Sequence, residues 1–241
     1  GDSTNLTSPL REAVGDYVSV GTRLDPDFES IRSSAPQLII GDSDRHKEIY
    51  EELSEIAPTI LFKSFDAGYQ ETLEVFQRIG TAVSKSKDAK ERLDRHQALV
   101  NDFNNQISID KNKETLAAVV SEQGVTAHSN STYVGEFLTK LGFATALNDK
   151  VADTLPAYRE SDYLEMSYEQ RANVNPERLI VMVEDDNDKD LNKLQNSNQW
   201  DDLEAVKSQR VHFVSRDDWA KLRGLIASED IVETLANLNE A

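Results

Sequence analysis

Short apolar runs alternate with helical periods through the first part of the chain. The expected strands are continuous apolar runs or alternate with period two, over residues 16–21, 37–41 and 59–62. The expected helices repeat apolar residues at helical spacing, over residues 26–35, 45–56 and 69–83. Strands that alternate with helices favour parallel pairing, and the run at 37–41 is typical of a buried parallel strand.

The pattern changes at residue 85, where helical spacing continues to about residue 107 without a turn signal. A helix of about 22 residues would be roughly 33 Å long. The α/β pattern then returns, with strands expected at 115–120, 179–183 and 210–214 and helices at 132–141 and 226–238. We therefore predict two α/β lobes, residues 1–84 and 110–241, joined by a single long helix at 85–109.

Composition narrows the classes of function. The chain has 241 residues, a formal net charge of −18 and no cysteine. An acidic chain repels phosphate backbones, so no nucleic-acid partner is expected. The lack of cysteine excludes thiolate nucleophiles, thiolate metal sites and disulfides. No apolar run approaches the roughly 18 residues that span a bilayer, so the sequence predicts a soluble chain. An anionic ligand would need a local group of Arg and Lys.

The sequence lacks the motifs of common enzymes. It has no nucleophile elbow, zinc HExxH, P-loop or dinucleotide-binding GxGxxG pattern. The histidines show no metal-pair spacing, and His96 and His212 lie where packed structural histidines are expected. The acidic stretch at 184–190 lacks the glycine and the terminal glutamate of a calcium loop, so we interpret it as a solvated loop. We predict no catalytic residue, no cofactor and no direct metal ligand.

Cations follow all three expected strands of the first lobe. The residues just past these strands are Arg23, Arg45 with His46, and Lys63 with Ser64. The carboxyl ends of parallel strands meet at one edge of the sheet, where ligands bind in open α/β folds. Each residue alone could be an ordinary surface cation, but their repetition favours a shared anion site.

A second group of candidate residues lies near the end of the chain. Trp219 and Arg223 are four residues apart after the strand expected at 210–214, a spacing that places an aromatic ring beside a guanidinium on a helical turn. Arginine binds carboxylates through two parallel hydrogen bonds, so the pair could contact an anion. Equally, Trp219 could be a core anchor with Arg223 as its cation–π partner.

These segments resemble a known family, the iron-chelate-binding lipoproteins of ABC importers, which have the class III periplasmic-binding-protein fold. The similarity is strongest to the ferric-citrate branch, and it covers essentially the whole chain. The matching residues are Val20-Gly21-Thr22-Arg23, Pro36 to Ile40 with Arg45-His46, Ile56 to Ser64 and Tyr69, Gly135, Leu138, Leu141-Gly142, Asp218-Trp219-Ala220, Leu222-Arg223-Gly224, Ala227 and Glu229.

The resemblance implies two doubly wound α/β lobes joined by one long helix, with the ligand between them. It also implies an N-terminal strand–helix–strand and a lipid-bearing cysteine upstream of residue 1, so we expect the first lobe to be incomplete here. The resemblance also adds three residues to the expected ligand contacts, namely Thr22, Tyr158 and Arg159. Glu48 and Glu204 are the positions nearest to the acidic residues that meet arginines of the permease, although each could be an ordinary solvated acid.

The implied function is capture of an anionic ferric chelate, with ferric citrate as the preferred ligand, for delivery to an ABC importer permease. The chelator holds the iron, so the protein needs cations and hydroxyls rather than metal ligands. The implied protein is a monomer outside the cytoplasm, held at the membrane only through its upstream lipid anchor. The alternatives are a hydroxamate or catecholate siderophore, a non-transport interaction module, and a metal-cofactor enzyme or scaffold, which would require Cys or His ligands.

Overall fold

The protein is described by a computed structural model that covers residues 8–64, 66–121, 124–148, 151, 162–166, 174–184, 189–197 and 200–240. The chain divides into two compact units, Gly1–Ala67 and Gly68–Ala241. The lobe boundaries expected from the sequence stay a prediction.

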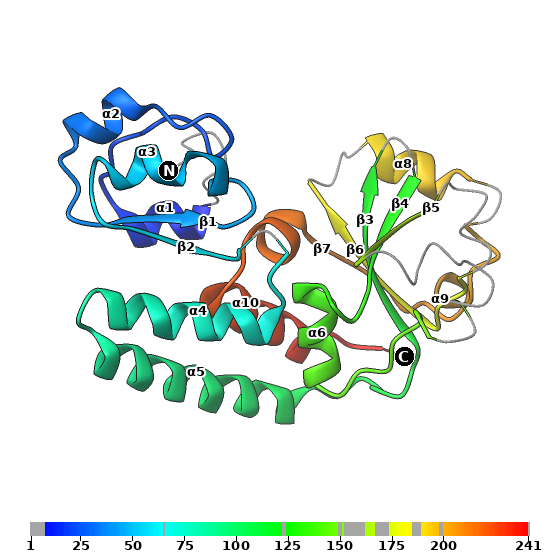
Figure 1. Ribbon diagram of the computed structural model, residues 1–241. Helices are drawn as coiled ribbons and strands as arrows, with labels where there is room; N and C mark the ends of the chain where they lie inside the picture. The colour runs from blue at the N-terminus through cyan, green and yellow to red at the C-terminus, as the bar shows by residue number, and fades with distance from the viewer. Residues whose placement is uncertain are drawn as a thin grey trace. The chain divides into compact units, whose positions relative to one another are not determined.

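The first unit is built around two parallel strands, β1 (Ile39–Asp42) and β2 (Thr59–Phe62), with Ile39 opposite Thr59 (Figure 1). Its helices are short, and Asp27 caps α2 by accepting hydrogen bonds from the amides of residues 29 and 30. These helices are α1 (Ser8–Val14), α2 (Phe28–Ser33), the 3₁₀ turn η1 (Lys47–Ile49) and α3 (Tyr50–Ser54).

Two expectations for the first unit were wrong. Residues 16–21 form no strand, and their only described β pairing is an isolated bridge between Gly21 and Pro26. Period-two alternation cannot make a strand without a partner, and Val18 is 72% exposed. The run at 37–41 does contribute a parallel strand, but Ile40 is 45% exposed, so this strand is not fully buried.

The second unit contains a mixed sheet in the order β5-β4-β3-β6-β7. Three strands run parallel: β3 (Thr115–Ser121), β6 (Arg178–Val183) and β7 (Val211–Ser215). The strands β4 (Gly124–His128) and β5 (Tyr163–Met166) are antiparallel additions that the sequence pattern did not predict. Every described residue of β6 is buried, as expected for a central parallel strand.

Helices pack around this sheet and against one another. The long helix is present as α5 (Ser86–Gln106), and it packs against α4 (Tyr69–Ala82) and α10 (Leu225–Ala236) within the second unit (Figure 1). The helix α6 (Tyr133–Lys140) contacts α4. The remaining described helices are α8 (Lys189–Gln195), α9 (Glu204–Lys207) and the π turn η4 (Asp217–Lys221).

A buried polar chain joins α4, α5 and α10. His96, 1% exposed, lies within hydrogen-bonding distance of Glu229 through Nδ1 (2.7 Å) and of the Tyr69 hydroxyl through Nε2 (2.9 Å). Arg92 donates two hydrogen bonds to the Glu229 carboxylate, at 2.6 and 2.8 Å. Burial lowers the pKa of His96, while its hydrogen bond to Glu229 acts in the opposite direction. The expectation of a structural His96 is therefore confirmed.

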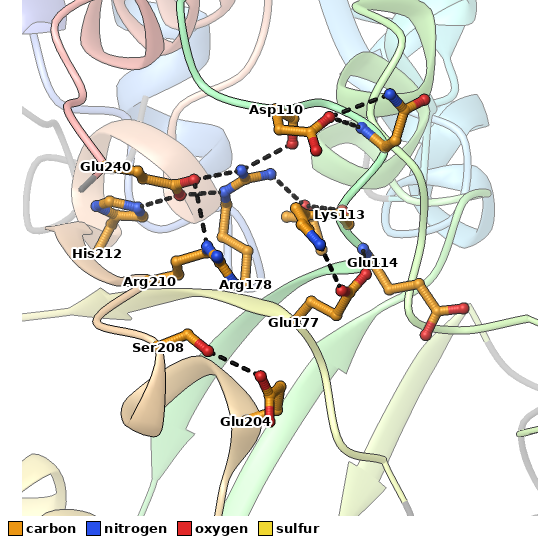
Figure 2. A network of polar contacts seen from close by, with 12 residues as sticks. Asp110, Lys113, Glu114, Glu177, Arg178, Glu204, Ser208, Arg210, His212 and Glu240 are labelled. Carbon is orange, nitrogen blue, oxygen red and sulfur yellow. Dashed lines mark hydrogen bonds and ion pairs between the residues drawn. The ribbon is translucent and has the colours of Figure 1, made fainter.

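A second network fixes the end of the chain against the sheet (Figure 2). Arg178 is completely buried and forms a double hydrogen-bonded ion pair with Glu240. Its guanidinium also donates to Thr115 Oγ1 (3.1 Å) and to the Asp110 carbonyl (2.8 Å). His212 lies 2.9 Å from Glu240 through Nε2, which confirms its structural role.

Candidate anion-binding site

The loop after β1 is organised by Asp42, a buried residue that is only 6% exposed. Its Oδ1 accepts hydrogen bonds from the amides of Asp44 (3.0 Å) and Arg45 (2.9 Å). Its Oδ2 accepts from the amide (3.0 Å) and the hydroxyl (2.5 Å) of Ser64. The Asp42 carboxylate therefore joins the turn that presents Arg45 to the segment that follows β2.

His46 makes the next connection. Its Nδ1 lies 2.8 Å from the Asp42 amide and must accept that hydrogen bond. The proton then sits on Nε2, which is 2.8 Å from the carbonyl oxygen of Arg23 and donates to it. Both ring nitrogens thus bind protein atoms. His46 holds the Arg23 loop against β1, and its role as a direct ligand contact stays a prediction.

The loop that presents Arg23 is shaped by Gly21 and Thr22. Gly21 has φ of +89°, and a Cβ there would lie 2.6 Å from both the Asp25 carbonyl oxygen and the Asp27 amide nitrogen, so the turn requires glycine. The Thr22 hydroxyl accepts a hydrogen bond from the Asp25 amide at 3.0 Å. That hydroxyl is exposed and retains its proton for donation to a ligand.

The structure therefore connects the three loops whose cations the sequence grouped together. Arg23 and Lys63 are exposed, Arg45 is half-buried, and Ser64 is bound to Asp42. Residues 16–21 form no strand, and His46 connects the Arg23 loop to β1 instead, while a shared anion site of these cations stays a prediction. Asp42 is the residue that the sequence reasoning missed. The sequence feature that could have revealed Asp42 is an acidic residue directly after the apolar run at 37–41, where a carboxylate can accept hydrogen bonds from turn amides.

An apolar cavity of about 300 Å³ lies beside these loops in the first unit. Thr22, Arg23 and His46 contribute to its lining, and most other lining residues are apolar, including Val20, Ile31, Pro36, Leu38, Ile39 and Leu53. A polyanion would lose hydration in such a cavity without compensating hydrogen bonds. Anion contacts are therefore better supplied by the loop cations, Arg23 among them, than by the apolar lining of the cavity.

In the second unit, Arg223 belongs to a smaller polar group. Its Nη2 donates to the Tyr163 hydroxyl at 3.2 Å, and the Tyr163 ring meets the His128 ring edge-on with centroids 5.0 Å apart. Burial, with the nearby charges of Arg223 and Arg216, lowers the pKa of His128 to about 4. His128 is therefore neutral near pH 7.

The expected geometry of Trp219 and Arg223 differs from the observed one. The π turn ends at Lys221, and Leu222 is extended, so Arg223 is not on the same helical turn as Trp219. Trp219 is 1% exposed, which favours its interpretation as a core anchor, while its role in ligand contact stays a prediction. Gly224, at φ +99°, directs the chain onward after Arg223, and the Tyr133 hydroxyl donates to its carbonyl at 2.7 Å.

Of the four remaining predicted site residues, the structure describes two. Tyr158 and Arg159 lie outside the described residues. Glu48 and Glu204 are both exposed, and Glu204 accepts a hydrogen bond from the Ser208 hydroxyl at 2.8 Å. Within the described part of the chain, no three His, Asp or Glu side chains are placed to hold a metal ion. None of the described helices is long and apolar enough to cross a bilayer.

Comparison with known proteins shows that this chain belongs to the periplasmic binding protein family, whose model matches residues 1–216. The Fe(3+)-citrate-binding protein YfmC of Bacillus subtilis is 34% identical over 228 residues, covering 93% of this chain and 69% of that protein. The Fe(3+) dicitrate-binding periplasmic protein FecB of Escherichia coli is 30% identical over 230 residues, covering 95% of this chain and 73% of that protein.

A solved structure supports the same fold. Staphylococcus aureus SirA complexed with staphyloferrin B superimposes with a TM-score of 0.77 at 22% identity, covering 95% of this chain and 80% of that one. The resemblance and the α/β periplasmic-binding fold expected from the sequence are thereby confirmed. The sheet of the second unit is mixed, because the antiparallel strands β4 and β5 join its three parallel strands.

Proposed function

We propose that this chain captures an anionic ferric chelate, most specifically ferric citrate, and delivers it to the permease of an ABC importer. The observation that carries the proposal is the linkage of three cation-bearing loops through Asp42 and His46 in the first unit. The names of YfmC and FecB support the choice of ferric citrate. In this proposal the protein is a non-enzymatic, monomeric carrier outside the cytoplasm, anchored through lipid, and it has no cofactor of its own.

The proposed contacts are chosen by chemistry. Ferric citrate exposes carboxylates, for which guanidinium, ammonium and hydroxyl groups are suitable donors. The iron is already coordinated by the chelator, so no protein ligand to the metal is required. The proposed contacts are Thr22, Arg23, Arg45, His46, Lys63 and Ser64 in the first unit and Tyr158, Arg159, Trp219 and Arg223 in the second.

Calorimetric titration with ferric citrate tests this function. We expect binding by the wild-type chain, and at least tenfold weaker binding for the double variant Arg45→Gln/Lys63→Gln, because each lost charge-assisted hydrogen bond is worth roughly 1.5–3 kcal/mol. The matched control is Arg78→Gln/Lys87→Gln, which removes the same charge from exposed ion pairs in the second unit. Equal weakening by both double variants would contradict a local site and indicate only a general charge effect.

Ferric hydroxamate and ferric catecholate complexes, titrated under the same conditions, test the alternative ligands. Tighter binding of either one than of ferric citrate would overturn the preferred ligand while retaining the class of function. If no chelate binds, the interaction-module alternative gains support.

Delivery to the permease is tested separately. We propose Glu48 and Glu204 as docking residues because both are exposed acids, one in each unit. Glu48→Gln/Glu204→Gln should reduce iron uptake by cells that depend on this protein and leave ferric-citrate affinity unchanged. Glu51→Gln/Glu233→Gln, which also changes one exposed acid in each unit, is the control. Equal uptake by the two double variants would reject these docking positions.

A further inference from the structure

Asp42 is unusual among the residues of the candidate site because it is an anion buried beneath cation-bearing loops. The residue is 6% exposed, and its carboxylate accepts hydrogen bonds from three backbone amides and one hydroxyl. A negative charge near an anion site opposes ligand binding by Coulomb repulsion. A carboxylate at this position must therefore contribute something that outweighs this repulsion.

Asp42 contributes by fixing the backbone geometry of the three loops. Oδ1 fixes the amide of Arg45, and Oδ2 fixes the amide and hydroxyl of Ser64, directly after Lys63. The Asp42 amide binds His46 Nδ1, and the other ring nitrogen of His46 binds the Arg23 carbonyl. Two further backbone hydrogen bonds, from Ser43 to Phe62 and from His46 to Asp42, close the same turn at 2.9 Å each. The backbone at all three cations is thus tied to one residue.

We propose that Asp42 is a positioning residue for chelate capture, which sets the spacing of the Arg23, Arg45 and Lys63 loops without touching the ligand. This inference rests on the proposed function. It requires a carboxylate, because the described partners of the side chain, three backbone amides and one hydroxyl, act as hydrogen-bond donors. An asparagine would turn its own NH₂ group toward either the Arg45 side or the Ser64 side, and one of the two loops would be released.

The test compares Asp42→Asn with Asp44→Asn. Both variants remove one negative charge from the same loop, but the exposed Asp44 contributes its backbone amide to the turn, which the substitution retains. In calorimetric titration with ferric citrate, Asp42→Asn should bind at least tenfold more weakly than wild type. Asp44→Asn should bind equally or slightly more tightly. If charge alone mattered, the two variants would change affinity in the same direction.

A double-mutant cycle separates positioning from a loss of stability. In the wild-type background, Arg45→Gln should weaken ferric-citrate binding about tenfold. In the Asp42→Asn background, the same substitution should cost less than threefold, because Arg45 is no longer held in place. A role in stability alone would leave the cost of Arg45→Gln unchanged. Thermal unfolding of each variant checks that it is folded at the temperature of the titration.

Amide hydrogen exchange gives a readout that does not depend on the ligand. Asp42→Asn should increase exchange at the amides of Arg45 or Ser64, while Asp44→Asn should leave both as in wild type. Wild type that binds ferric citrate, together with equal affinities for the two Asn variants, would overturn the positioning role alone. A wild-type chain that binds no chelate would overturn the proposed function, and this role with it.

Discussion

Asp42 in the first unit and Glu240 in the second are both buried carboxylates, but different donors stabilise them. Glu240 is 8% exposed and pairs with the guanidinium of Arg178, whereas backbone amides and a serine hydroxyl bind Asp42. The ion pair fixes the chain end to a well-buried sheet. The amide-bound carboxylate instead shapes loops beside a small, partly exposed sheet. In our proposal, buried charge serves stability in the second unit and ligand geometry in the first.

The largest effect is expected when the second unit loses its buried cation. Arg178→Leu would leave the Glu240 carboxylate buried without its main partner, so the free energy of unfolding should fall by about 3–5 kcal/mol. Urea unfolding followed by circular dichroism measures this loss. Lys113→Met is the control, because the Lys113–Glu177 pair is about one-third exposed and should contribute less than about 1 kcal/mol. A similar loss in both variants would remove the distinction between buried and surface pairs.

Acid should weaken the second unit in two pH ranges. The pKa of His128 is lowered to about 4, so its contribution to stability is fully present above the unfolded value of 6.5 and is lost as the pH falls toward 4. The loss should be about 3 kcal/mol at most. Burial opposes a lower pKa at Glu240, but the hydrogen bonds from Arg178 and His212 outweigh it, so its contribution is lost below pH 4.5.

Unfolding measured at pH 7 and pH 5 separates these two ranges. His128→Gln should show a smaller decrease in stability between the two pH values than wild type, because Glu240 remains ionised throughout that interval. An unchanged decrease would mean that His128 does not titrate as its burial implies.

A smaller loss is expected from the polar chain between helices. Tyr69→Phe removes the hydroxyl that lies 2.9 Å from buried His96 Nε2, and an unsatisfied buried nitrogen costs roughly 1–3 kcal/mol. Tyr50→Phe, at a tyrosine that is 42% exposed, is the control and should be near neutral. Thermal unfolding of the two variants gives the comparison, and equal midpoints would show that the His96 hydrogen bond contributes nothing net.

The smallest stability effect is expected in the first unit. In Gly41→Ala, the new Cβ would lie 2.8 Å from Leu61 Cδ2 and 3.0 Å from His46 Nδ1. The leucine side chain can move, so we expect a loss of only about 1 kcal/mol. Displacement of His46 should nevertheless weaken ferric-citrate binding severalfold. A variant with wild-type affinity would show that the His46 connection is not needed for the ligand geometry.

The sequence pattern predicted the regular elements well where a buried face repeats over many residues. Helix α5 and strands β3 and β6 lie close to their expected positions. The antiparallel strands β4 and β5 were missed, since a short strand has too few residues to show its period clearly. Residues 16–21 show the opposite error, because local alternation cannot reveal whether a partner strand exists.

The candidate site was predicted only in part for a similar reason. Cations after strand ends were visible as sequence positions, and the family resemblance gave them a function. The four described side-chain hydrogen bonds of Asp42 join residues up to 22 positions apart, and the His46–Arg23 contact spans 23 positions, so neither followed from local spacing. The burial of Trp219 and the end of its π turn before Arg223 likewise depend on tertiary packing.

Native mass spectrometry of the chain, incubated with equal amounts of ferric citrate, a ferric hydroxamate and a ferric catecholate, tests the central claim most directly. The mass of the complex identifies both the chelator and the bound iron. We predict a complex with ferric citrate in the wild-type chain and its loss in Arg45→Gln/Lys63→Gln. Selection of the hydroxamate or catecholate, or a ferric-citrate complex that persists in the double variant, would contradict it.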